Sequence, residues 1–177
     1  MDRSKYCYDY PRPAVSADIV VFGYDNQGIN LLLITRRQDP YKNHWALPGG
    51  FLEISETIEC CAVRELYEET NIKNVLLVQL YAFSAIGRDP RDRVITIAFW
   101  TIIKMNIEHI LAGDDASRTE WFNIKSLPLL AFDHLEIVNK AVENLKILFK
   151  NSLDEICDRF DFLSAIDRQA LQKALSF

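Results

Sequence analysis

The sequence is poor in cysteine, and its four cysteines show no spacing typical of a zinc site. Cys60 and Cys61 are neighbours in a predicted helix, so their side chains point in different directions. A disulfide framework belongs to secreted proteins, and no apolar stretch follows a basic start, as a signal peptide would require. We therefore expect Cys7, Cys60, Cys61 and Cys157 to be reduced thiols, with Cys61 in the core.

The sequence also lacks a long apolar run and an excess of positive charge. No apolar stretch approaches the roughly 20 residues that a membrane-spanning helix needs, and a net charge of −5 does not favour broad attraction to nucleic acid. A length of 177 residues with 49% hydrophobic residues is sufficient for one domain with a packed core. We expect a cytoplasmic protein without membrane or nucleic-acid partners.

Strand and helix patterns alternate along the chain in an order typical of a layered α+β or α/β domain. Strand-like runs cover residues 14–22, 29–35, 75–83, 94–104 and 120–122. Helical patterns run from Ser55 or Thr57 to about Thr70 and from Phe132 to about Lys150. The predicted division is an N-terminal arm (1–13), a main domain (14–150) and a short helical C-terminal extension (151–177).

Residues 50–72 concentrate acidic side chains in a segment predicted to be largely helical. Residues three and four apart on a helix are neighbours, so Glu65 shares a side with Glu68 and Glu69, and like charges placed there repel. Arg64 is the local cation that offsets them. The commonest reason for such a cluster is a hard divalent cation bound through oxygen atoms. The alternative is a solvated acidic helix face.

The same segment carries a long motif. Gly50 is followed after five residues by Glu56, and seven further residues lead to the run RELYEETNI, which starts at Arg64. This pattern resembles the Nudix hydrolase box, G-x5-E-x7-R-E-U-x-E-E-x-G-U, in which U is a bulky aliphatic residue. The second glycine alone differs, and Asn71 is the next-best residue for the left-handed conformation expected at that helix end.

The resemblance implies an α/β fold, a mixed-sheet α/β/α sandwich in which the box forms a strand-loop-helix unit; the C-terminal pattern adds extra helices. It also implies hydrolysis of the pyrophosphate bond in a nucleoside diphosphate derivative, with Mg²⁺ or Mn²⁺ as cofactor. Glu65 and Glu69 match the family's principal metal ligands, and Glu68 matches a further ligand or a base. The carbonyl group of Gly49 corresponds to the backbone oxygen that completes the metal shell.

Arg64 and Glu56 resemble the family's supporting pair, in which the guanidinium holds carboxylates in place. The general base is less defined, because Nudix enzymes take it from the box or from a later loop. The later candidates here are residues 113–115 and Glu120, and turn formation is the alternative explanation for the aspartates of that loop. His134 is expected to be a capping or core histidine rather than a catalyst.

Short stretches outside the box resemble the ADP-ribose pyrophosphatase subgroup. They lie at residues 10–15, 45–51, 87–91, 113–116 and 131–134, and the resemblance covers about residues 10–148. It implies hydrolysis of ADP-ribose to AMP and ribose 5-phosphate by a homodimer, in which both subunits contribute to the substrate cleft. The aromatic, proline-containing arm at residues 6–13 is the candidate for crossing to the partner.

A charged loop outside the box supplies candidates for substrate binding. Arg88, Arg91 and Arg93 suit a second phosphate or a terminal ribose, because arginine forms bidentate contacts with phosphate. The alternative is a solvated loop held by local pairs with Asp89 and Asp92.

Two other functions stay open. Some Nudix-like proteins that resemble the same subgroup are ADP-ribose-sensing transcriptional regulators with a C-terminal winged helix that binds DNA. Here 27 residues follow Lys150 (177 minus 150), too few for that domain, and their acidic side chains suit a DNA backbone poorly. The second alternative is sanitation of nucleoside triphosphates, for which the same box would serve.

Overall fold

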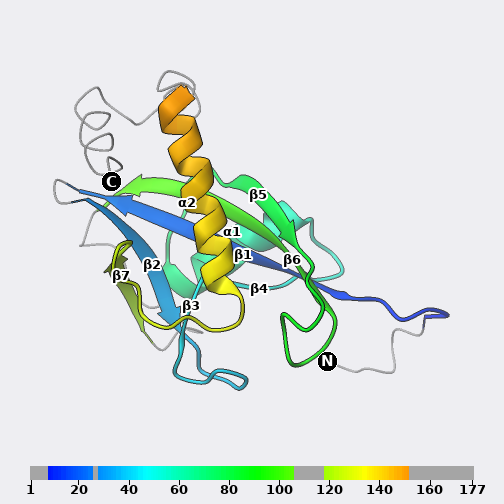
Figure 1. Cartoon of the computed structure of the whole chain (residues 1–177). Coiled ribbons are helices and arrows are strands. Elements are labelled where there is room, and N and C mark those ends of the chain that lie inside the picture. The colour runs from blue at the N-terminus through cyan, green and yellow to red at the C-terminus, as the bar shows by residue number, and fades with distance from the viewer. Residues whose placement is uncertain (1–7, 26–27, 106–117, 152–177) are drawn as a thin grey trace.

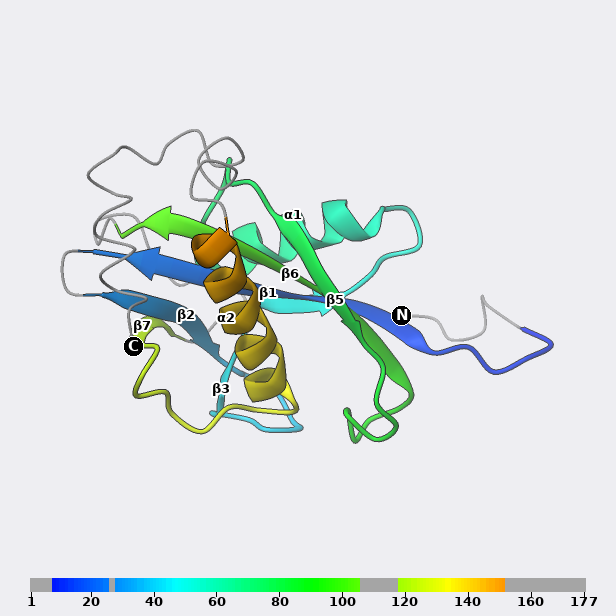
Figure 2. The same ribbon diagram turned by 45° about the horizontal axis from the view of Figure 1, so that its top comes forward.

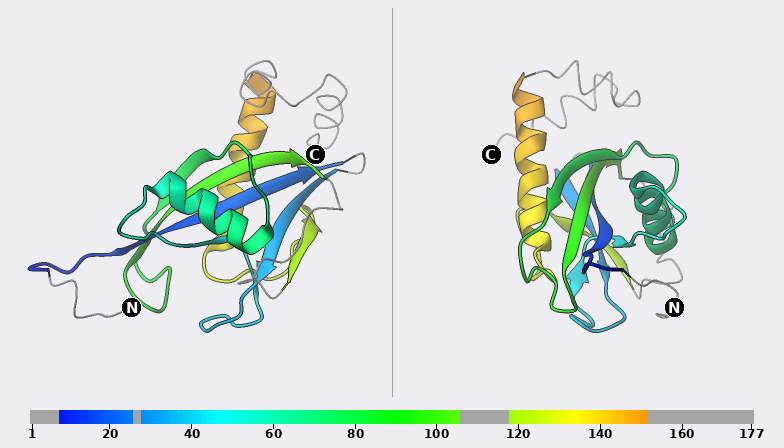
Figure 3. Two further views of the ribbon diagram at one scale, coloured as in Figure 1. Left: turned by 180° about the vertical axis from the view of Figure 1, so that it is seen from behind. Right: turned by 90° about the vertical axis from the view of Figure 1, so that its right-hand side faces the viewer.

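The computed structural model describes residues 8–25, 28–105 and 118–151. The strands are β1 (Ala14–Tyr24), β2 (Ile29–Thr35), β3 (Trp45–Ala46), β4 (Gly49–Phe51), β5 (Val78–Phe83), β6 (Val94–Lys104) and β7 (Thr119–Asn123). The helices are α1 (Ile58–Thr70) and α2 (His134–Asn151). In these ranges a mixed sheet is covered by α2 on one face and by α1 on the other (Figures 1 and 3). The predicted α/β class with a three-layer sandwich is confirmed.

The sheet is built around the parallel pair of β1 and β6, which are aligned along their whole lengths. The strand order is β3-β2-β1-β6-β5, while β4 pairs with β1 and β7 pairs with β2. In the antiparallel pairing of β4 with β1, Gly49 lies opposite Asp18. This pairing places the first residues of the box against the central strand of the sheet.

Side chains of β1 alternate between two cores, as the period of a strand requires. Val20 and Phe22 belong to the core beneath α2, whereas Ile19 and Val21 belong to the core beneath α1. β2 behaves in the same way, with Leu32 in the second core. β2 is therefore buried on both faces.

The box helix α1 begins and ends where its local sequence predicts. Thr57 is the N-cap, and its hydroxyl accepts a hydrogen bond from the N–H of Cys60 at 3.3 Å. At the other end Asn71 adopts the left-handed conformation (φ 60°, ψ 13°), and its N–H donates to the carbonyl of Tyr67. Cys61 faces the sheet and is fully buried, which confirms its place in the core.

Some element bounds differ from the predicted ones. β5 begins at Val78 rather than at residue 75, since Val75 packs against the core beneath α1 without joining the sheet. α2 begins at His134 rather than at Phe132, because Phe132 has a φ of 51°, which an α-helix does not admit. The predicted extension after Asn151 lies outside the described residues. Neither α1 nor α2, the helices of the described part, is long and apolar enough to cross a membrane.

Residues 8–13 precede β1 as an exposed segment that projects beyond the sheet (Figure 2). Tyr10 is 80% exposed, and the guanidinium of Arg12 lies over the ring of Tyr8, 3.9 Å from its centre. Partner contact by the arm stays a prediction, and residues 1–7 are outside the part of the chain that the structure describes.

Candidate active site

Arg64 is the hub of the carboxylates on and before α1. Its Nε and Nη2 atoms donate to the two oxygens of Glu56 at 3.0 and 2.6 Å. Its Nη1 atom donates to Glu65 at 2.8 Å and to Glu68 at 3.1 Å. Because Arg64 donates to the charged form of Glu56, it lowers the pKa of that carboxyl group to about 2. One guanidinium thus offsets the repulsion among these acidic side chains.

Glu69 lies apart from this hub, where its side chain lines a pocket. Its Oε2 atom accepts a hydrogen bond from the N–H of Gly49 at 2.8 Å. Desolvation, together with the negative charges of Glu65 and Asp18, raises the pKa of Glu69 to about 8. Burial is the largest cause of this shift, and the N–H of Gly49 and the charge of Arg36 oppose it.

Gly49 and Gly50 occupy positions where no other residue fits without displacement. Gly49 has a φ of 155°, and a Cβ atom there would collide with the carbonyl oxygen of Ala17. A Cβ atom at Gly50 would collide with the carboxylate of Glu65. The glycine pair lets the backbone of β4 lie directly beside the acidic groups of α1.

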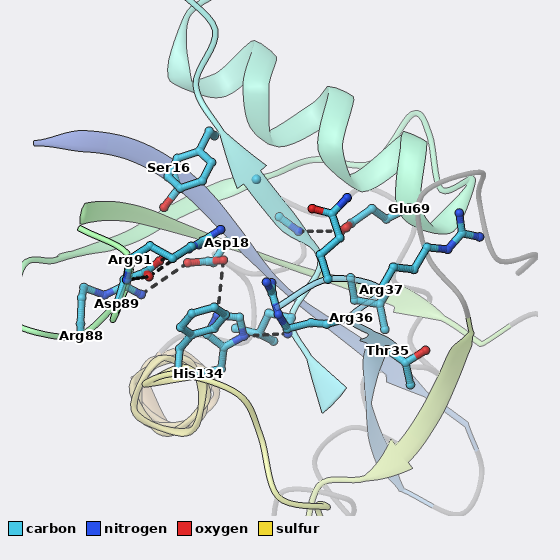
Figure 4. A pocket seen from close by; sticks show the side chains of 17 residues that line it. Ser16, Asp18, Thr35, Arg36, Arg37, Glu69, Arg88, Asp89, Arg91 and His134 are labelled. Atoms are coloured by element: carbon cyan, nitrogen blue, oxygen red, sulfur yellow. Dashed lines mark hydrogen bonds and ion pairs between the residues drawn. The ribbon is translucent and has the colours of Figure 1, made fainter. Parts of the chain in front are cut away.

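A pocket of about 290 Å³ opens beside Glu69 (Figure 4). This volume is close to the lower end of the range of roughly 300–1,000 Å³ for small-molecule sites. The lining residues come from β1, the end of β2 and the loop after it, the connection between β3 and β4, β4, α1, the loop between β5 and β6, and the start of α2 with the segment before it. The charged ones are Asp18, Arg36, Arg37, Glu69, Arg88, Asp89 and Arg91.

The structure separates the arginines of the loop between β5 and β6. Arg88 lines the pocket with a side chain that is 4% exposed, and it donates to both oxygens of Asp133 at 2.7 and 2.6 Å. Arg93 is not among the lining residues; its guanidinium donates to the carbonyl groups of Ser84 at 2.9 Å and Ala85 at 3.3 Å. Arg88 therefore anchors the loop to the start of α2, whereas Arg93 closes the loop on itself.

Arg91 stands at the pocket between two aromatic rings. Its guanidinium lies 4.9 Å from the ring centre of Phe51 and 5.4 Å from that of Phe132. It also forms a bidentate pair with Asp89, which is the local pairing expected as the alternative to substrate binding. Arg36 lies over Phe132 as well, 4.7 Å from the ring centre. Planar cations and aromatic faces are thus combined at one wall of the pocket.

The model of the NUDIX domain family matches residues 12–142 of this chain. The chain belongs to the Nudix hydrolases. The matched range runs from the residues before β1 into α2, so this Nudix domain includes both the carboxylate cluster around Arg64 and the pocket beside Glu69.

Relatives of the Nudix domain include an enzyme and a transcriptional repressor. The chain is 43% identical over 129 residues to the ADP-ribose pyrophosphatase of Methanocaldococcus jannaschii, and the match covers 73% of each protein. It is 34% identical over 146 residues to the ADPR responsive transcriptional repressor NtrR of Acinetobacter baylyi, covering 77% of this chain but 56% of the repressor. The solved NUDIX domain of Shewanella oneidensis NrtR, complexed with ADP ribose, matches with a TM-score of 0.70 and 28% identity, covering 82% of this chain and 99% of that one.

The acidic side chains of the Nudix box do not converge on a common metal position in this structure. Among the residues that the structure describes, no three His, Cys, Asp or Glu side chains form a ready metal cluster. Arg64 holds Glu65 and Glu68, whereas Glu69 turns toward the N–H of Gly49. The donor chemistry nevertheless fits a hard cation, because carboxylate and carbonyl oxygens are the ligands that Mg²⁺ prefers. Glu69 lies close enough to Glu65 and Asp18 for their charges to raise its pKa, in addition to the larger effect of burial.

Asp18, Arg36, Phe51 and Phe132 line the pocket, although the sequence did not predict them as site residues. One signal was available for Asp18, which is a charged residue inside an otherwise apolar strand-like run. Because both faces of that strand are buried, a carboxylate there requires a partner or a ligand. The other three residues carry no such signal, since arginines and phenylalanines in loops and short strands are common.

His134 is buried, as expected of a core histidine, and it also lines the pocket. It is 4% exposed, and its Nδ1 atom accepts a hydrogen bond from the N–H of Leu47 at 2.9 Å. Of the later candidates for the general base, Glu120 forms an ion pair with Arg118 and does not line the pocket. Residues 113–115 lie outside the described ranges.

Proposed function

We propose that this Nudix hydrolase cleaves the pyrophosphate bond of ADP-ribose and releases AMP and ribose 5-phosphate. The observation that carries the proposal is the pocket in which Glu69 of the box helix meets Arg88 and Arg91 of a distant loop. Such a pocket combines a carboxylate that can bind a metal ion with guanidinium groups that can bind phosphate. The similarity to an ADP-ribose pyrophosphatase and to a domain complexed with ADP ribose supports the substrate.

The proposed metal ligands are the carboxylates of Glu65, Glu68 and Glu69 and the carbonyl group of Gly49, with Mg²⁺ or Mn²⁺ as the cation. When bound, the cation would neutralise phosphate charge and activate a water molecule. Glu68 is also a candidate base, because it is the exposed member of the cluster. Arg64 restricts the orientation of the carboxylates through the hydrogen bonds described above.

Glu56 and the arginines of the loop between β5 and β6 differ in the hydrogen bonds that they already form within the protein, and we propose different roles for them accordingly. Glu56 holds Arg64 through two hydrogen bonds, so its role is to position that guanidinium. Arg91 is 40% exposed at the side chain and is the better placed of the loop arginines for direct phosphate contact. Arg88 is buried against Asp133, and Arg93 bonds backbone carbonyl groups; for these two we propose that they shape the loop that presents Arg91.

A substrate panel tests the proposal. ADP-ribose, NADH, diadenosine polyphosphates, sugar nucleotides and oxidised dGTP would be incubated with the protein and Mg²⁺ or Mn²⁺, and the products separated by chromatography. We expect AMP and ribose 5-phosphate from ADP-ribose, and no turnover after chelation of the metal. Preference for a triphosphate would contradict the proposal that ADP-ribose is the substrate, and it would support nucleotide sanitation instead.

A second candidate function is ADP-ribose sensing by a transcriptional regulator. The similarity to the repressor NtrR favours it, although the alignment spans about half of the repressor's length. A sensor would bind ADP-ribose without hydrolysing it and would retain duplex DNA at physiological salt. We expect turnover and no DNA retention, and both are measurable with the same preparation by product assay and by a fluorescence shift with a long duplex.

We further propose that the protein acts in the cytoplasm as a homodimer, with the N-terminal arm (1–13) contacting the partner. The exposure of residues 8–13 and of Tyr10 in particular supports this use of the arm. Light scattering after size-exclusion chromatography measures the mass in solution. A monomeric mass at assay concentration would contradict a substrate cleft shared between subunits.

A further inference from the structure

Asp18 is a buried carboxylate that faces the pocket. The residue is 7% exposed and lies on the central strand β1 (Figure 4). Its Oδ2 atom is 3.6 Å from Nη2 of Arg88, and its Oδ1 atom is 3.7 Å from Nε2 of His134. Both separations exceed the usual length of a hydrogen bond. Within the described part of the chain, no group donates a hydrogen bond to Asp18, so its oxygens retain acceptor capacity toward the cavity.

The groups around Asp18 direct their hydrogen bonds to other partners and reach Asp18 only at the longer separations given above. Arg88 directs its two short hydrogen bonds to Asp133. His134 uses Nδ1 to accept from the N–H of Leu47, which requires a neutral ring, and its Nε2 atom lies 3.7 Å from Asp18. A buried carboxylate without a hydrogen-bond donor is costly, and a ligand that supplies donors would relieve that cost. The site therefore requires hydroxyl or amide donors from whatever enters the pocket.

The charges that line the pocket define the ligand further. Arg91 and Arg36 attract phosphate, whereas Asp18 and Glu69 repel it. Glu69 has a candidate partner in the metal. Asp18 belongs to β1 rather than to the box, lies beside the backbone of Gly49, and is not among the proposed metal ligands. A pyrophosphate joined to a neutral sugar matches such a mixed pocket, because carboxylates accept hydrogen bonds from ribose hydroxyls in other nucleotide sites. A chain of three phosphates would bring a negative charge toward Asp18.

We propose that Asp18 is a specificity-determining residue that accepts hydrogen bonds from the hydroxyl groups of a ribose and repels an additional phosphate. The inference rests on the proposed function, since it assumes that a sugar-linked diphosphate is the substrate. Selectivity then arises in two ways at one residue, from attraction to the sugar and from repulsion of a triphosphate.

The test is the variant Asp18→Asn, assayed with ADP-ribose as substrate and ATP as competitor at constant free Mg²⁺. We expect the KM for ADP-ribose to rise about tenfold or more, the effect of a lost hydrogen bond to a charged group, and the inhibition constant of ATP to fall. These opposite shifts distinguish a change of specificity from structural damage to the pocket, because damage would weaken the binding of both ADP-ribose and ATP. Two constants that are unchanged, or that rise together, would overturn the inference.

Two further variants control for charge and for folding. Asp92→Asn removes the same charge from an exposed loop position outside the pocket lining, and we expect neither constant to move. Asp18→Glu keeps the charge but displaces the carboxylate by one methylene group. Asp18→Glu should raise the KM for ADP-ribose without lowering the inhibition constant of ATP. A lower inhibition constant of ATP for this variant would count against charge repulsion.

The wild-type protein supplies a measurement that needs no substitution. ADP-ribose analogues with a 2-deoxy sugar at either end would be compared by KM, and we expect a clear loss for one of them, which identifies the ribose that Asp18 contacts. Equal KM values for both analogues and ADP-ribose would overturn the inference. If the wild-type protein does not hydrolyse ADP-ribose, the proposed function fails; if it does and the Asp18 variants behave like wild type, this inference alone fails.

Discussion

The backbone N–H of Leu47 donates a buried hydrogen bond to Nδ1 of His134 across 2.9 Å. Because Nδ1 accepts, the ring proton of the neutral imidazole lies on Nε2, which faces Asp18 at 3.7 Å. The bond ties the start of α2 to the residues that lead into Gly49 and the box. Protonation of Nδ1 would remove the acceptor, so the arrangement requires a neutral histidine.

This bond predicts loss of stability in mild acid. Burial is the largest cause that lowers the pKa of His134 below its ordinary value near 6.5. The negative charges of Asp18 and Asp133 oppose this shift, whereas the positive charges of Arg88 and Arg36 add to it. Below about pH 6.5 the unfolded chain binds a proton that the folded chain excludes, so the free energy of unfolding falls as the pH falls. The slope for one such group is at most about 1.4 kcal/mol per pH unit.

The measurement is urea unfolding of wild type and His134→Gln between pH 7 and pH 5. Glutamine can accept from Leu47 but does not titrate, so we expect a shallower pH dependence for the variant. His44→Gln, at an exposed histidine, is the matched control and should follow the wild-type curve. Parallel curves for wild type and His134→Gln would contradict the assignment.

Glu69→Gln should abolish most turnover while leaving the fold intact. The substitution removes the charge of a proposed metal ligand, and loss of groups that only support such ligands already costs about 10- to 100-fold. We therefore expect kcat to fall by at least about a hundredfold. Glu59→Gln, at an exposed position on the same helix, should retain nearly full activity with an unchanged thermal midpoint. A near-normal rate for Glu69→Gln would rule out the metal assignment.

The two glycines of β4 should respond differently to alanine. At Gly50 the new Cβ meets the carboxylate at the end of the flexible Glu65 side chain, which can move away. Gly50→Ala should therefore lose activity and require more metal for half-maximal rate, with little change in the thermal midpoint. At Gly49 the Cβ meets the rigid backbone of Ala17, so Gly49→Ala should lower the thermal midpoint clearly. Equal thermal midpoints for both variants would contradict this distinction.

Asp133→Asn should destabilise the domain far more than removal of an exposed acidic partner. Arg88 is 4% exposed, and loss of the charge of Asp133 leaves this buried cation with the longer pair to Asp18; breaking a buried pair typically costs about 3–5 kcal/mol. Glu143→Gln breaks the exposed pair with Lys140 and should cost no more than about 1 kcal/mol. Chemical unfolding at neutral pH compares the two, and similar losses would show that the Arg88 pair does not anchor the loop.

Local rules predicted the box helix α1 well, because its signals lie close together in the chain. Thr57 and Asn71 cap α1 as expected from the preferences of threonine and asparagine, and the bounds of β2 and β6 match the predicted runs. The start of α2 was misplaced because the left-handed conformation of Phe132 is set by its packing near Arg36 and Arg91, not by its own preference. Tertiary contacts overrode local propensity there.

The sequence by itself determined the Nudix box, the family and the hub around Arg64, because these depend on spacing within one short segment. Only the tertiary structure decided which arginines line the pocket, that Arg88 is bound by Asp133, and that Asp18 lies beside Gly49. Those relationships join residues from separate strands and loops. They arise from the pairing of β1 with β4 and with β6, and no local pattern specifies which distant side chains such pairing brings together.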